Sequence, residues 1–134
     1  MIGDTDFFID LAHPGRPHHA RAAAKARDLE GRGIHIAMTA ITRFELATGV
    51  EQFVRPEEER ERVQSLLRSY PTHSLDGPAA DRAGAIHGSL RKRGDVLGTA
   101  DALIAAIALE SREPLLTRNR KDFVLVPGLV LEAY

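Results

Sequence analysis

Cysteine and tryptophan are both absent from the 134-residue sequence, and the aromatic residues are limited to five phenylalanines and two tyrosines. Without cysteine, the chain can form neither disulfide bonds nor zinc sites with thiolate ligands. No run approaches the roughly 18 apolar residues of a membrane-spanning helix, and the first residues lack the basic and apolar regions of a signal peptide. We therefore expect a cytoplasmic protein without a membrane segment, in which residues 1–134 form one domain.

The sequence also lacks an excess of either charge. Eighteen Lys and Arg residues stand against nineteen Asp and Glu residues, which gives a formal net charge of −1. The overall charge therefore neither favours nor excludes a polyanionic partner. Any nucleic-acid site has to come from a local cluster of basic residues.

What the sequence does contain is an alternation of short apolar segments with longer helix-forming segments. Helix boundaries are marked by signals such as Pro56 before three glutamates and Gly31 after an alanine-rich stretch. This order favours an α/β domain built on a parallel sheet, with the nearly apolar helix at 99–109 deeply buried. The expected strands are 1–5, 34–37, 71–75, 114–117 and 129–131, and the expected helices are 7–12, 18–30, 39–48 or 42–48, 56–70, 79–90 and 99–109, with a short turn at 119–123.

Acidic residues recur where a predicted strand ends or the following helix begins. Asp4 ends the first strand, Glu45 follows the second, Asp101 opens the buried helix, and Asn119 and Asp122 follow the strand at 114–117. In an open parallel sheet, ligands bind beyond the carboxyl ends of the strands. These side chains are therefore expected to meet at one edge of the sheet.

Helix capping is the alternative explanation for each of these positions. The T-x-x-E sequence at 42–45 fits a capping box, Thr99 could cap the helix that contains Asp101, and the turn at 119–122 has the same spacing. Two like charges about 4 Å apart repel by on the order of 4 kcal/mol at an effective dielectric constant of about 20. Several converging carboxylates therefore require a cation or protonation, and oxygen ligands alone favour Mg²⁺ or Mn²⁺.

Four sequence blocks, in order along nearly the whole chain, carry a family resemblance. They are GDTDFFIDL at the start, TAITRFELATGV, LGTADALIAAIAL and LLTRNRKDF. Together they resemble the PIN-domain ribonucleases, and most closely the VapC-type toxins of toxin–antitoxin pairs. The resemblance implies a three-layer α/β/α fold with a central parallel sheet, and the activity of a Mg²⁺- or Mn²⁺-dependent endoribonuclease.

The resemblance also implies roles for the acidic residues. Asp4 and Asp101 would be the principal metal ligands, and Glu45 would complete the cluster directly or through water. At the fourth position, either Asn119 or Asp122 would contribute, directly or through water. One or two metal ions are both compatible with this set.

Neighbouring residues would support these ligands. Thr5 resembles the hydroxyl that the family carries beside its first ligand, and Thr117 belongs to the fourth block. Asp6 stands where asparagine is commoner in the family, so it either caps the first helix or adds negative charge to the site. Asp10 is expected to be a solvated surface residue.

Basic residues near the fourth block are the first candidates for contact with RNA phosphates. A second cluster at 91–93 is also explained as a favourable basic helix C-terminus. The histidine-rich loop at 13–19 is expected to be exposed, with contact to RNA or a protein partner as the functional alternative. The candidates for RNA contact are Arg43, Arg118, Arg120, Lys121, Arg91, Lys92 and Arg93.

By the same resemblance, the partners would be RNA, a VapB-like antitoxin that places a basic residue among the acids, and a second copy of the chain in a homodimer. A stand-alone PIN nuclease and a catalytically silent module that binds RNA or protein remain alternatives. A more distant alternative is a phosphatase with an aspartyl nucleophile, because Asp4-Thr5-Asp6 imitates a D-x-D motif. That phosphatase would form a covalent aspartyl phosphate on Asp4 and would leave the later three blocks without a use.

Overall fold

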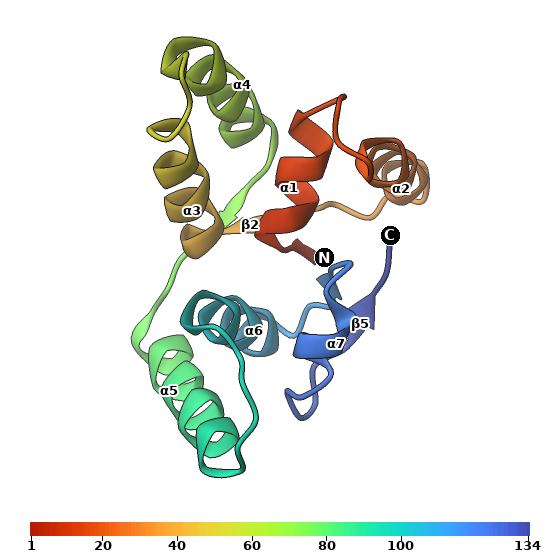
Figure 1. Ribbon diagram of the computed structural model, residues 1–134. Coiled ribbons are helices and arrows are strands. Elements are labelled where there is room, and N and C mark those ends of the chain that lie inside the picture. Colours follow the sequence, from red (N-terminus) through yellow and green to blue (C-terminus); the bar gives the residue numbers. More distant parts are fainter.

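The computed structural model describes residues 1–134, which form seven helices and five short strands (Figure 1). The strands are β1 (Ile2–Gly3), β2 (Met38–Thr39), β3 (Thr72–His73), β4 (Leu115–Leu116) and β5 (Leu131–Glu132). The helices are α1 (Thr5–Ala12), α2 (His19–Gly31), α3 (Ala40–Val50), α4 (Pro56–Ser69), α5 (Gly77–Lys92), α6 (Thr99–Ser111) and α7 (Arg120–Phe123). None of these helices is both long and apolar enough to cross a membrane.

Every strand pair is parallel. The strands β1, β4 and β5 form one small sheet, in which Ile2 lies opposite Leu115, while β2 and β3 form another. A bridge between Ile2 and Ala37 joins the two, so the strands follow the order β3-β2-β1-β4-β5. The predicted α/β class with a parallel sheet is confirmed, and all strands end at the same edge.

Helices cover both faces of this sheet and give three layers. In Figure 1, α1 to α4 lie on one side of the strands and α5 to α7 on the other. Alternate strand residues supply the two cores: Ile2 and Leu115 pack with α5 and α6, whereas Met38 and Leu116 pack with α1 to α4. The helix α6 is buried along most of its length, as its apolar sequence predicts.

Gly3 is needed at the junction of β1 and α1 because two aromatic rings approach its backbone closely. A Cβ atom at this position would lie 2.9 Å from ring atoms of both Phe7 and Phe8, well inside van der Waals contact. The two rings are completely buried and meet edge to face, with centroids 5.2 Å apart. This packing fixes the start of α1 directly after the first strand.

The predicted elements are present, with shifted boundaries in a few places. The second strand was expected at 34–37, but the regular pairing lies at Met38–Thr39, where the Met38 amide donates to the carbonyl of Pro71. The last strand is likewise displaced from 129–131 to Leu131–Glu132. These shifts arise because the hydrogen bonds to neighbouring strands, rather than local hydropathy, determine which residues pair.

Candidate functional site

Asp4 occupies the turn between β1 and α1 and is only 3% exposed. Its Oδ1 atom accepts a hydrogen bond of 2.7 Å from the Phe7 amide, so Asp4 is the N-cap of α1. Its Oδ2 atom accepts a hydrogen bond of 2.5 Å from the Thr117 hydroxyl, which follows β4. The carboxylate is therefore anchored from two strands at the edge where both strands end.

The carboxyl groups of Asp4 and Asp101 titrate far above the ordinary aspartate range. Burial, together with the charges of Asp6 and Asp101, raises the pKa of Asp4 to about 7. Burial, followed by the charges of Glu45, Asp122 and Asp6, raises the pKa of Asp101 to about 6. The structure thus brings these five acids into one electrostatic environment. Their positions at the strand ends predict this for Asp4, Glu45, Asp101 and Asp122.

Glu45 lies in the second turn of α3 and faces the start of α1. The Thr5 hydroxyl donates to Glu45 Oε2 at 2.5 Å. The capping-box explanation for Glu45 is wrong, because Thr39 rather than Thr42 is the N-cap of α3 and accepts from the Thr42 amide at 3.0 Å. Glu45 therefore has no capping role, and its side chain belongs to the acidic group.

The two other capping explanations also fail. Gly98, not Thr99, occupies the N-cap position of α6, and no side chain caps that helix. At the start of α7, the Asn119 amide group donates to Asp122 Oδ2 at 2.7 Å instead of capping the backbone. The Asn119 backbone amide in turn donates to the Thr117 hydroxyl oxygen at 2.8 Å. A hydrogen-bonded chain thus connects Asp122 to Asp4 through Asn119 and Thr117.

Asp6 forms an ion pair with a basic residue of the same chain. Its Oδ2 atom lies 3.1 Å from a terminal nitrogen of Arg118, which follows Thr117 in the chain. Burial would lower the pKa of Arg118, but the charges of Asp6 and Asp10 raise it above its ordinary value. Of the two roles expected for Asp6, the helix cap is wrong, since Asp4 takes that position. Asp6 instead adds a neutralised acid to the edge of the cluster.

Asp10 is completely buried, and the expectation of a solvated residue is wrong. Its carboxylate accepts hydrogen bonds from Arg16 Nε at 2.7 Å, Arg118 Nε at 2.8 Å and the Tyr134 hydroxyl at 3.1 Å. Burial alone would raise its pKa, but these three donors and the Arg118 charge hold the pKa of Asp10 below its ordinary value. The signal in the sequence is the spacing to Phe7, which puts both residues on one helix face.

The basic candidates lie at three places in the fold. Arg118 contacts the acidic cluster through Asp6, and the exposed Arg120 and Lys121 follow it in α7 without ion-pair partners. Residues 91–93 instead end α5, where Arg93 pairs with Asp95 at 3.2 Å. In Figure 1 this end of α5 lies at the bottom of the view, away from α3. Arg43 donates to the Thr72 hydroxyl at 3.2 Å, on the side of α3 that faces β3.

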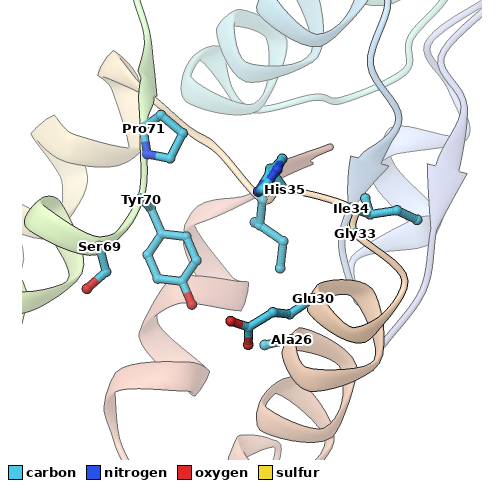
Figure 2. A pocket seen from close by; sticks show the side chains of 9 residues that line it. Ala26, Glu30, Gly33, Ile34, His35, Ser69, Tyr70 and Pro71 are labelled. Atoms are coloured by element: carbon cyan, nitrogen blue, oxygen red, sulfur yellow. The ribbon is translucent and has the colours of Figure 1, made fainter.

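A cavity of about 350 Å³ lies elsewhere, beside the residues that precede β2 and β3 (Figure 2). Figure 2 shows the Tyr70 ring directed toward the carboxylate of Glu30. Burial and the charge of Glu30 raise the pKa of Tyr70. None of the acids near Asp4 and Asp101 lines this cavity, and the cavity lies at the opposite edge of the parallel sheet. The acidic cluster at the carboxyl edge is therefore the candidate functional site.

A family model described as the PIN domain matches residues 1–129. The chain belongs to the PIN-domain family. This PIN domain is 28% identical over 97 residues to ribonuclease VapC2 of Rickettsia felis, covering 72% of each chain. It is also 28% identical over 97 residues to the tRNA(fMet)-specific endonuclease VapC of Salmonella typhimurium, covering 72% of this chain and 74% of the relative.

The PIN domain also superposes on solved structures. One is VapBC2 from Rickettsia felis bound to a DNA fragment from its promoter, with a TM-score of 0.85 and 22% identity. The match covers 99% of this chain and 97% of the other. It confirms the predicted three-layer PIN fold, in which the ends of β1 and β4 and the start of α6 face one another.

Proposed function

We propose that this PIN domain, formed by residues 1–134, is a metal-dependent endoribonuclease that acts as the toxin of a VapBC-type pair. The observation that carries the proposal is the convergence of Asp4 and Asp101, both with raised pKa values, at the carboxyl edge of a PIN fold. The names of the relatives, a ribonuclease and a tRNA endonuclease, support the same reaction class.

The chemistry of the donor set suits Mg²⁺ or Mn²⁺. The candidate ligands are all oxygen atoms. Burial together with repulsion from neighbouring carboxylates disfavours the ionised forms of Asp4 and Asp101, which a divalent cation would reverse. The structure contains no group of three or more His, Asp or Glu side chains that could hold a metal ion. Mg²⁺ does not require such a group, because it usually takes only one or two protein carboxylates and keeps several waters.

Asp4 and Asp101 would hold the ion directly, with Glu45, Asn119 and Asp122 contributing directly or through water. When bound, such an ion supplies a nucleophile at neutral pH by lowering the pKa of a water, and it stabilises the leaving oxygen. The residues around it orient the ligands: Thr117 fixes one oxygen of Asp4, and Thr5 fixes Glu45. Without cysteine, covalent catalysis by a thiolate is excluded.

This mechanism does not use the 2′-hydroxyl group of RNA, so selection of RNA has to come from binding. We assign contacts with the RNA phosphates first to Arg118, Arg120 and Lys121, because these cations lie beside the acids. Arg43 is the next candidate. The cluster at 91–93 stands last, since it lies at the far end of α5.

The proposed partner is a VapB-like antitoxin that inserts a basic residue among the carboxylates. Such a residue would relieve the repulsion that raises the pKa values of Asp4 and Asp101. The solved structure of VapBC2 from Rickettsia felis, a toxin–antitoxin complex, supports this assignment. We further expect a homodimer. A neighbouring reading frame for a small antitoxin would distinguish the toxin from a stand-alone nuclease.

The decisive experiment measures cleavage of RNA by the wild type, Asp4→Asn and Asp101→Asn, with Mg²⁺ or Mn²⁺ and with a chelator. We expect metal-dependent cleavage by the wild type and a loss of at least about 100-fold in each variant, beyond the 10- to 100-fold typical of outer-shell residues. Asp81→Asn, at an exposed position of α5, is the matched control and should cleave normally. Unchanged cleavage by both site variants would refute the metal-site assignment.

Two further results would support the other functions. A wild type that cleaves no RNA but still binds RNA or a partner protein would support the catalytically silent module. The phosphatase alternative predicts a covalent aspartyl phosphate on Asp4, which mass spectrometry of the protein after incubation with a phosphate monoester would detect. We expect no such acyl phosphate, because the later three sequence blocks have no role in that reaction.

A further inference from the structure

A cavity of about 350 Å³ lies between α1, α3 and α4, and Glu45 of the acidic cluster forms part of its wall. We propose that this cavity binds an unpaired nucleobase of the RNA, next to the phosphodiester that is cleaved, and so sets the sequence preference of cleavage. The proposal rests on the proposed ribonuclease function. Its volume lies at the lower end of the range for small-ligand sites, which suits a single planar ring system.

The position of the cavity follows from the two roles of Glu45. One carboxylate oxygen accepts from Thr5 at the acidic cluster, while the residue also lines the cavity on the other side. Glu45 therefore joins the acidic cluster, where the phosphodiester would be held, to the cavity, where the neighbouring base would lie.

The cavity wall offers an aromatic face for stacking. The Phe53 side chain is 48% exposed and lies parallel to the His13 ring, with centroids 6.1 Å apart and an interplanar angle of 10°. Such exposed rings stack unpaired bases in proteins that recognise single-stranded RNA. Exposure of the apolar Phe53 ring to water contributes nothing to the stability of the fold, and a surface that binds a base would use this exposed ring.

The His13 ring is held rigidly in this wall. Its Nδ1 atom lies 2.7 Å from the carbonyl oxygen of Ile9, and its Nε2 atom lies 2.9 Å from Glu59 Oε1. Glu59 is buried and also accepts from Arg62 at 2.6 Å. The expected exposed loop at 13–19 therefore contributes a fixed ring rather than a mobile one.

Arg16 supplies the polar part of the cavity. Its Nε atom donates to the buried Asp10 at 2.7 Å, which fixes the guanidinium plane, while its side chain stays 43% exposed. The terminal nitrogens make no hydrogen bond within the chain and remain available to a base edge or a flanking phosphate. Parallel aromatic rings beside a planar guanidinium are the groups on which unpaired bases stack.

The test compares cleavage of a 5′-labelled pool of randomised RNA oligonucleotides by the purified wild type, Phe53→Leu, Phe53→Tyr and Val54→Ala in Mg²⁺. Leucine keeps an apolar side chain of similar size without a π face, tyrosine keeps the ring, and Val54 is 99% exposed outside the cavity. Sequencing of the products gives the base preference around each cut. Kinetics on the preferred sequence separate KM from kcat.

We expect Phe53→Leu to raise KM roughly 5- to 150-fold, the range for one stacked base, and to flatten the base preference at one position beside the cut. Val54→Ala should match the wild type, and Phe53→Tyr should restore the base preference that Phe53→Leu loses, because tyrosine keeps the ring. An unchanged preference in Phe53→Leu would overturn the pocket while leaving the nuclease intact. Normal cleavage by Phe53→Leu combined with weaker inhibition by a protein partner would also overturn it, and would assign the cavity to that partner. A wild type without any RNA cleavage refutes the proposed function itself.

Discussion

The Asp4 carboxylate uses its two oxygens for different purposes. Oδ1 caps α1 through the Phe7 amide, and Oδ2 accepts the Thr117 hydroxyl, which holds the carboxyl plane in one orientation. Both hydrogen bonds lower the pKa of Asp4 and so partly offset burial. A local structural role and a candidate ligand role therefore coexist in one side chain.

Thr117→Val tests the second of these contacts. The substitution removes the hydroxyl donor at nearly constant shape, so the pKa of Asp4 should rise further and the carboxylate should lose its orientation. If Asp4 is a metal ligand, we expect Mn²⁺ to bind 10- to 100-fold more weakly, as is typical for outer-shell residues. Titration calorimetry measures this affinity. Thr117→Ser keeps the hydroxyl and should retain most of it, whereas equal affinity in the valine variant would exclude Asp4 as an oriented ligand.

Asp10→Asn tests a residue whose importance is structural. The asparagine keeps the size of the side chain but leaves Arg16 and Arg118 without the buried carboxylate to which both donate. We expect the free energy of unfolding in urea to fall by on the order of 3 kcal/mol. The matched control is Asp28→Asn, which breaks an exposed i,i+4 pair with Arg32 and should cost less than about 1 kcal/mol. Similar losses in both variants would contradict the structural role of Asp10.

Among the secondary-structure elements, the junction of β1 and α1 is the most tightly packed. Gly3→Ala would place a Cβ atom 2.9 Å from the rings of Phe7 and Phe8, both without free space around them. We expect a loss of about 1 to 3 kcal/mol in the free energy of unfolding, because an overpacked core must shift. Thermal unfolding followed by circular dichroism measures it.

The matched glycine is Gly84 in the exposed part of α5. A Cβ atom there meets nothing within 4 Å, and alanine is the better helix former. Gly84→Ala should therefore stabilise the protein by about 0.5 to 1 kcal/mol. If the packing at Gly3 is as described, Gly3→Ala lowers the free energy of unfolding and Gly84→Ala raises it.

Sequence patterns located the helices better than the strands. Pro56 and the following glutamates correctly mark the start of α4, because capping and dipole effects act within one turn. The start of α3 was ambiguous between Thr39 and Thr42, and the buried hydroxyl of Thr39 takes the cap. The two-residue strands have no local signal of their own. Their limits depend on partners far away in the chain, such as Pro71 for Met38.

The same distinction applies to the site. Strand-end positions and family motifs predicted that Asp4, Glu45 and Asp101 would share one edge of the sheet. In the structure the charge of Asp101 raises the pKa of Asp4, and the charge of Glu45 raises the pKa of Asp101, so these groups lie near one another. The environment of Asp10 could not be predicted, since its donors Arg118 and Tyr134 lie 108 and 124 residues away. Only the folded chain brings these groups together.

For the molecule as a whole, the raised pKa values of Asp4 and Asp101 predict how stability depends on pH. In the folded chain these values are about 7 and about 6, compared with a reference value of 3.8. The folded state therefore binds protons more tightly than the unfolded state. The resulting stabilisation is complete below about pH 4 and is lost as the pH rises through 6 and 7. In a buffer that contains a chelator, the midpoint temperature of thermal unfolding should decrease as the pH is raised from about 5 to about 8.

Two comparisons isolate the origin of this fall. Asp4→Asn cannot ionise at this position and should flatten the pH dependence measured by differential scanning fluorimetry. Mg²⁺ or Mn²⁺ should raise the midpoint of the wild type at about pH 8, because a ligand that binds only the folded state stabilises it. The proposed site predicts no such rise in Asp4→Asn. An equal rise in both proteins would place the metal elsewhere.

The order of the strands determines when the acidic cluster can form during translation. The central strand β1 is synthesised first, yet its neighbour β4 and the acid Asp122 come more than a hundred residues later. A nascent chain that has not reached this segment lacks Thr117, the donor that anchors Asp4. The acidic cluster is therefore incomplete throughout most of translation. An enzyme that attacks RNA would thus be assembled only after the greater part of its own message has been read.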